Sequence, residues 1–296
     1  MTDYTAYTGS KAGVREYMHT VSDGVKLKVI DFTPLKIEEG RPVIVFIAGW
    51  ISLIRGWRDF LSALTPHYRV IYAETREKGS SVIPDIKSAS FSMERMKDDI
   101  QDLVKGLLPE GAPLVLAGSS LGASAIMEYC MSGGREPMCT ALVGPNGEFR
   151  FPRFLSGLIP VLHPSLYFAV KPVIKWYLRN FRVNSEAERE QIEKYELTLD
   201  HADPYRLKRN ALAIKNWSIK KDGTITVPSL ILGATTDSLH NTDNLKRVLK
   251  HFPRGEYIEL ASNRETHSAK AAHVIMDYIE RIASTTPAEG NVTANP

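Results

Sequence analysis

Short runs of apolar, often β-branched residues recur along the chain. The first, "PVIVFIAG" at 42–49, is almost continuously apolar, as is typical of a strand buried on both faces of a parallel sheet. Similar runs follow at 69–75, 113–119, 139–145, 227–234 and 255–261. Because helical patterns lie between several of these runs, the sequence predicts βαβ crossovers. The expected fold class is therefore α/β, with a mostly parallel central sheet flanked by helices.

Helical periodicity and one hairpin pattern complete this arrangement. Residues 93–108 place five apolar side chains on one helical face: Met96, Ile100, Leu103, Val104 and Leu107. Helical patterns also follow at 122–132 and, closing the fold, at 268–283. Before the first buried run, residues 15–32 alternate between apolar and polar around Ser22-Asp23-Gly24, which predicts an antiparallel hairpin at the sheet edge.

The strand–helix alternation stops between residues 148 and 222. This stretch has no buried-strand run; its first half is apolar, aromatic and basic, and its second half has helical periodicity with Ser185 and Asp203 as capping candidates. We therefore expect a helical cap inserted into a core domain formed by residues 1–147 and 223–283. The small, polar residues 284–296 are expected to form a disordered tail.

Composition excludes several classes of protein. With 296 residues, 43% hydrophobic and 24% charged, the chain is that of an ordinary globular protein, and a net charge of +3 gives no case for nucleic-acid binding. Cys130 and Cys139 lack the spacing of a zinc site, and neither a metal nor an organic cofactor is expected. The N-terminus lacks a signal-peptide core and no apolar run reaches about 18 residues, so a cytoplasmic location is expected.

Residues 118–122, Gly-Ser-Ser-Leu-Gly, form a G-x-S-x-G pattern centred on Ser120. It lies between a strand pattern and a helix pattern, which is the context this motif requires. The small flanking residues Gly118 and Gly122 allow a tight, strained turn that places Ser120 at a helix N-terminus. Ser119 is not centred between the glycines and is the weaker candidate. The alternative is a glycine-rich turn that contains serines by chance.

A catalytic serine needs a base and a group that orients the base. Asp237 follows the strand pattern at 227–234, and His267 lies in the polar loop after 255–261. Both therefore belong at the carboxyl edge of the sheet, together with Ser120. Glu148, after the run at 139–145, is an alternative orienting carboxylate.

With these residues, the chain resembles the α/β-hydrolase family from about residue 20 to 283. The resemblance implies a Ser120–His267–Asp237 triad and identifies the helical insertion as the family's lid. "ETREKGSS" at 74–81 is similar to the family's D-x-R-G-x-G-x-S segment, in which Arg76 and Gly79 would shape a turn. Members commonly carry His-Gly after the first buried strand, whereas this chain has Ala48-Gly49-Trp50. The oxyanion donors would then be the backbone N–H groups of Trp50 and Leu121.

Such a triad catalyses acyl transfer, and the cap suggests an apolar substrate. We expect hydrolysis of a hydrophobic carboxylic ester or thioester, with five residues in contact with the substrate: Gly49, Ser119, Phe154, Leu158 and Leu162. Cap cations at 150, 153, 171, 175, 179 and 182 would suit an anionic headgroup or weak contact with a membrane surface, although a solvated basic face also explains them. An acyltransferase and a non-catalytic ligand-binding protein remain as alternatives; the oligomeric state stays open.

Overall fold

The computed structural model describes residues 3–149, 157, 159–177, 179–180, 189–235 and 242–285. Within them, an eight-stranded sheet has the order β1-β2-β4-β3-β5-β6-β7-β8. The strands from β4 through β3 to β8 pair in parallel, and β1 and β2 add an antiparallel edge. The predicted α/β class, mostly parallel sheet and edge hairpin are confirmed.

The strands fall on the predicted runs; the buried strands are somewhat shorter than predicted, and the hairpin extends beyond residues 15–32 at both ends. Those of the hairpin are β1 (Ala12–Thr20) and β2 (Lys26–Pro34). The buried strands are β3 (Val43–Ile47), β4 (Val70–Ala73), β5 (Leu114–Ser119), β6 (Cys139–Val143) and β7 (Ser229–Ala234). The last strand, β8 (Gly255–Leu260), is exposed on part of its length, because it forms the other edge of the sheet.

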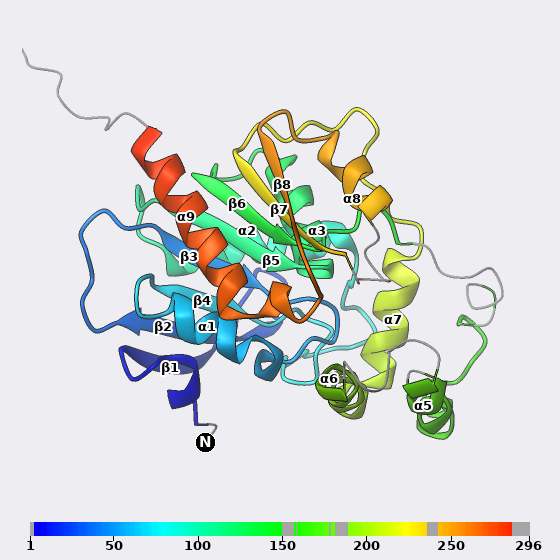
Figure 1. The fold of residues 1–296 in the computed structure, drawn as a ribbon. Coiled ribbons are helices and arrows are strands. Elements are labelled where there is room, and N and C mark those ends of the chain that lie inside the picture. Colours follow the sequence, from blue (N-terminus) through cyan, green and yellow to red (C-terminus); the bar gives the residue numbers. More distant parts are fainter. Residues whose placement is uncertain are drawn as a thin grey trace, which may run out of the picture.

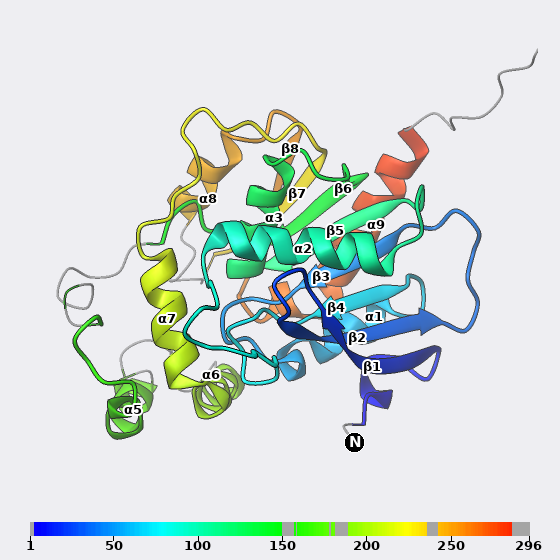
Figure 2. The ribbon, with the colours of Figure 1, turned by 180° about the vertical axis from the view of Figure 1, so that it is seen from behind.

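Helices cover both faces of the sheet. α1 (Arg58–Leu64) and α9 (Ala269–Thr285) pack together on the face seen in Figure 1. α2 (Met93–Leu107) and α3 (Leu121–Cys130) pack together on the opposite face, seen in Figure 2. α8 (Thr242–Leu249) lies beside β7 and β8. α9 continues to Thr285, two residues into the segment predicted as a tail, and residues 286–296 lie outside the described part.

Much of the described part of the predicted cap is helical. They form α5 (Leu166–Tyr177), α6 (Arg189–His201) and α7 (Pro204–Ile214), which lie together at one side of the molecule (Figures 1 and 2). α7 begins as predicted at Asp203, whose carboxylate accepts the Tyr205 and Arg206 amides. Near the two ends of the predicted cap, Glu148 and Ser218 form an antiparallel bridge. Ser185, the other capping candidate, lies outside the described residues.

No helix in the described part of the chain is long and apolar enough to cross a membrane.

The buried side chain of Arg76 connects three parts of the fold: the segment after β4, helix α2 and the β1–β2 turn. Arg76 is fully buried; its Nε donates to Asp99 of α2 at 2.6 Å and its Nη1 donates to Asp23 of the β1–β2 turn at 2.8 Å. Burial alone would lower the pKa of Arg76, but the two carboxylates raise it above its ordinary value. Asp99 therefore occupies the apolar face of α2 as the partner of a buried cation. Arg76 has a structural role, as the resemblance implied.

Replacing Arg76 with leucine is expected to lower the free energy of unfolding by about 3–5 kcal/mol, because two carboxylates lose their buried partner. Urea denaturation followed by circular dichroism measures this change. Arg281→Leu is the matched control, since Arg281 pairs with Glu256 on the exposed surface and its loss should leave the midpoint nearly unchanged. Equal effects of the two substitutions would contradict the assignment of Arg76 as a clamp.

Candidate active site

Ser120 occupies a strained turn between β5 and α3. Its backbone has φ 46° and ψ −113°, a conformation that is costly for a residue with a side chain. Its amide donates to the carbonyl of Val143 at 2.9 Å, and its own carbonyl accepts the Ser124 hydroxyl at 3.0 Å. Ser120 is partly exposed, whereas Ser119 is only 5% exposed and ends β5. This geometry is what the G-x-S-x-G pattern predicted for Ser120.

The two glycines of the motif are required by the close approach of this turn to β3. A Cβ on Gly118 would lie 2.9 Å from the carbonyl oxygen of Ile47. A Cβ on Gly122 would lie 2.3 Å from that oxygen and 2.6 Å from the carbonyl oxygen of Ala48. These distances leave no room for a side chain. The turn and the end of β3 are therefore packed backbone to backbone.

The loop after β3 lies directly against the serines. A Cβ on Gly49 would be 2.9 Å from Ser119 Oγ and 3.4 Å from Ser120 Cβ. Trp50, the next residue, therefore follows directly after a residue that packs against the Ser120 turn. Ile51 has φ 48°, which is a rare value for a β-branched residue. Leu121 begins α3, and a first helical residue has no intrahelical acceptor for its N–H. The two predicted oxyanion donors are therefore on segments that flank Ser120.

His267 lies in the short 3₁₀ helix η4 (Glu265–His267), between β8 and α9. Its Nδ1 is 3.0 Å from the carbonyl oxygen of Asn263 and 2.9 Å from Thr266 Oγ1. Because a carbonyl oxygen can only accept, the neutral ring carries its proton on Nδ1. In that tautomer Nε2 carries the lone pair that a general base requires.

Trp57 connects His267, the predicted base, to the loop after β3. It ends the 3₁₀ helix η2 (Ile54–Trp57), is fully buried, and its ring centroid lies 4.1 Å from that of His267. Its indole N–H donates to Ser52 Oγ at 3.1 Å. A rigid aromatic therefore supports the His267 ring from within the segment that follows Trp50. The sequence analysis missed this residue.

Asn146 is a second residue that the sequence analysis missed. Its side-chain amide donates to Ser120 Oγ at 3.3 Å, and its amide N–H and its carbonyl both bond to the Ser124 hydroxyl. Asn146 follows β6, the strand next to β5 in the sheet. Its signal in the sequence was a polar side chain just after a buried strand, the same signal that identified Asp237.

The predicted acid, Asp237, lies outside the described residues, as do the predicted substrate contacts Phe154 and Leu158. The alternative acid, Glu148, is described and lies 3.6 Å from Arg247 of α8. Leu162, the other predicted cap contact, is half-buried, and its carbonyl accepts Lys208 Nζ at 2.7 Å.

The described cap cations are paired within the cap. Lys171 and Lys175 both contact Asp200 of α6, at 2.9 and 2.7 Å, and Arg179 pairs with Glu196. The exposed side of α5 is instead apolar: Leu166, Phe168, Val170, Val173 and Trp176 are all more than a third exposed. The cations at 150, 153 and 182 lie outside the described residues.

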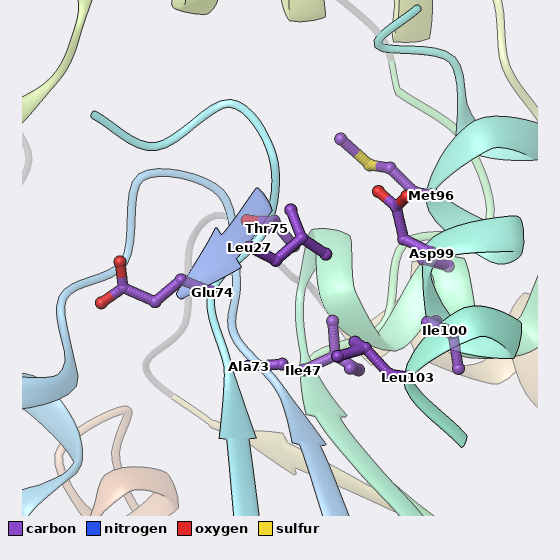
Figure 3. A pocket seen from close by; sticks show the side chains of 10 residues that line it. Leu27, Ile47, Ala73, Glu74, Thr75, Met96, Asp99, Ile100 and Leu103 are labelled. Carbon is purple, nitrogen blue, oxygen red and sulfur yellow. The ribbon is translucent and has the colours of Figure 1, made fainter. Parts of the chain in front are cut away.

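A small cavity lies between the sheet and α2 (Figure 3). Its lining comes from the ends of β3 and β4 and the buried face of α2, including Ile47, Ala73 and Ile100. Ser120 and His267, the predicted catalytic residues that the structure describes, are not among its lining residues. Among the described residues, no cluster of three or more histidine, cysteine or acidic side chains could hold a metal ion.

Gly122→Ala is expected to destabilise the protein by about 1–3 kcal/mol, although alanine favours helices, because the new methyl group would overlap the end of β3. Thermal unfolding measures the loss. Gly56→Ala is the control, since its Cβ would meet no atom within 4 Å. If Gly122→Ala proved as stable as Gly56→Ala, the backbone-to-backbone contact would not constrain the turn.

Comparison with known proteins agrees with this architecture. The family model described as "Serine aminopeptidase, S33" matches residues 39–261. A search of the curated proteins found no match. The structure is similar to an enol-lactonase from Burkholderia xenovorans, with a TM-score of 0.72, 18% identity, and 89% and 100% of the two chains covered. It is also similar to an esterase from Exiguobacterium antarcticum, with a TM-score of 0.71, 18% identity, and 90% and 100% coverage. The family match spans most of the chain, which therefore belongs to the serine aminopeptidase S33 family of α/β-hydrolases.

Proposed function

We propose that the protein is a serine hydrolase that cleaves a carboxylic ester or thioester of a small to medium hydrophobic acyl group. The observation that carries this proposal is the strained backbone of Ser120 at the start of α3. Such strain is retained where it exposes a reactive side chain, and a helix N-terminus provides donors for an oxyanion. The loop of Gly49 and the residue His267 follow strands at the same edge of the sheet.

In the proposed reaction, Ser120 Oγ attacks the acyl carbon and His267 Nε2 accepts the serine proton. The N–H groups of Trp50 and Leu121 would stabilise the oxygen that becomes negative. His267 then transfers the proton to the leaving alcohol or thiol, and water hydrolyses the acyl-enzyme by the reverse sequence. Asp237 is proposed to stabilise the imidazolium. The contact of His267 Nδ1 with the Asn263 carbonyl supports the required tautomer.

An ester is proposed over an amide because the predicted acyl-binding residues of the cap are apolar. Two structural neighbours are described as an esterase and an enol-lactonase, which is in keeping with this choice. The family description names an aminopeptidase, so amide cleavage is a necessary comparison in the assays.

Weak contact of the cap with a membrane surface stays a prediction. The exposed apolar side chains of α5 favour it, and the internal pairing of Lys171 and Lys175 removes part of its electrostatic basis.

A fluorophosphonate is expected to label the protein stoichiometrically at Ser120, because an activated serine reacts with this probe whatever the natural substrate is. Intact mass and peptide mapping locate the adduct. Ser120→Ala should abolish labelling, and Ser119→Ala should leave the adduct at position 120. A folded protein that takes up no label, or takes it up at Ser119, would contradict the proposed nucleophile.

Turnover is expected to be faster for nitrophenyl esters and thioesters with short and medium acyl chains than for long-chain esters or aminoacyl nitroanilides. Products formed with an added alcohol separate the alternatives: free acid indicates a hydrolase, and a new ester indicates an acyltransferase. If no substrate were turned over while an apolar ligand bound tightly, the non-catalytic binding protein would replace the present proposal.

A further inference from the structure

The segment at 74–81 departs from the D-x-R-G-x-G-x-S pattern that it resembles. Glu77 stands where the pattern has its first glycine. The same chain has Ala48-Gly49-Trp50 where the resemblance would place His-Gly after the first buried strand. The two departures meet in space, because a carboxylate oxygen of Glu77 accepts the amide N–H of Ile51 at 3.4 Å.

Glu77 is held in a position that is costly for a carboxylate. The residue is 1% exposed, and its Oε1 also accepts the Thr75 hydroxyl at 2.7 Å. Its Oε2 is buried and has no hydrogen-bond partner among the described residues. The neighbouring Lys78 is 6% exposed, and its Nζ likewise has no hydrogen-bond partner among them. Buried polar atoms without partners cost free energy, so their presence calls for a reason other than stability.

Among the charged and titratable groups of the described residues, Lys78 and Tyr72 interact electrostatically with Glu77, and Glu74 acts on both Lys78 and Tyr72. Burial raises the pKa of Glu77, against the opposing effects of Lys78 and of the Thr75 hydrogen bond. Burial lowers the pKa of Lys78, against the attraction of Glu74 and Glu77. Each group therefore occupies a place where its charged form is disfavoured.

The backbone on either side of Glu77 is fixed to the rest of the fold. On one side, Arg76 is bound to α2 through Asp99. On the other, Arg206 of the cap helix α7 donates to the carbonyl oxygens of Lys78 and Ser81. The Glu77 carboxylate thus projects from a rigid support toward the loop that follows β3.

We infer that Glu77 is a positioning residue for the oxyanion loop: its carboxylate holds the Ile51 amide and so fixes the preceding N–H of Trp50 toward Ser120. This rests on the proposed serine hydrolase function. Ile51 has φ 48°, a conformation that a β-branched residue keeps only when its surroundings hold it. The carboxylate supplies an attachment for this loop, which lacks the histidine that the resemblance would place at Ala48.

The simpler explanation is that Glu77 only neutralises Lys78. A charge-balanced pair of variants separates the two roles: Lys78→Met alone, and Glu77→Ala combined with Lys78→Met. If Glu77 were only a counter-ion, the double variant would match or exceed Lys78→Met in labelling rate and stability. If it positions the loop, the double variant loses the acceptor of the Ile51 amide whatever its stability.

The test measures hydrogen exchange of the Ile51 amide and the rate of fluorophosphonate labelling. Relative to Lys78→Met, we expect the double variant to exchange Ile51 about 10-fold faster or more and to label about 10- to 100-fold more slowly. With the ester that the wild type turns over fastest, kcat should fall while KM changes less than about two-fold. Asp31→Asn is the control: Asp31 lies in β2, and its buried carboxylate pairs with Arg69. This substitution should change neither the hydrogen exchange of Ile51 nor the labelling rate.

Glu77→Gln provides the rescue, because its amide oxygen can still accept the Ile51 N–H. Protection of Ile51 and a labelling rate within about three-fold of wild type are expected. Unchanged Ile51 exchange in the folded double variant would overturn the inference. Should the double variant fail to fold, loss of Ile51 protection in Glu77→Gln would overturn it, because the acceptor oxygen is still present there. Absence of any adduct on the wild type would instead refute the hydrolase proposal, and Ile51 exchange would still decide whether Glu77 holds the loop.

Discussion

The close backbone approach between the Ser120 turn and the end of β3 is the constraint on which the site depends. Gly118 and Gly122 have no space for a Cβ because the carbonyl oxygens of Ile47 and Ala48 occupy it. This contact brings the start of α3 and the loop after β3 together, so the two proposed oxyanion donors flank one serine. The strain at Ser120 is tolerated because β6 and α3 both hold the turn through hydrogen bonds.

Buried charged residues follow the carboxyl end of β4 at this edge of the sheet. Arg76 joins the segment after β4 to α2 and to the β1–β2 turn, and its charge is fully compensated by carboxylates. Glu77 and Lys78, the next two residues, are also buried, and within the described part of the chain Glu77 Oε2 and Lys78 Nζ have no hydrogen-bond partner. A protein can retain such groups where they serve a site, since apolar residues would be less costly there. Arg76, with both of its carboxylate partners, is thus a structural clamp, whereas Glu77 acts on the loop after β3 through the Ile51 amide.

The proposed base and nucleophile, His267 and Ser120, are each in contact with a residue from another connection of the fold. Trp57 comes from the β3–α1 connection and contacts His267 after β8, while Asn146 comes from the loop after β6 and contacts Ser120 after β5. Helix α7 reaches the same region, because Arg206 donates a hydrogen bond to the carbonyl oxygen of Ser81 in the segment after β4. The segments that follow β3, β4, β5, β6 and β8 are thus linked by contacts at the carboxyl edge of the sheet, where sites in α/β folds are usually found.

The sequence by itself determined the strands, the edge hairpin, the helices α2, α3 and α9, and the turn at Ser120. These follow from local patterns: buried parallel strands are continuously apolar, amphipathic helices repeat every three to four residues, and a tight turn requires glycine. Only the tertiary structure decided that Glu77 meets Ile51, that Trp57 supports His267, and that Asn146 reaches Ser120. Each of these contacts joins residues on separate loops. Their side chains have no periodic pattern, because their positions depend on how the strands order in the sheet and not on their neighbours in the chain.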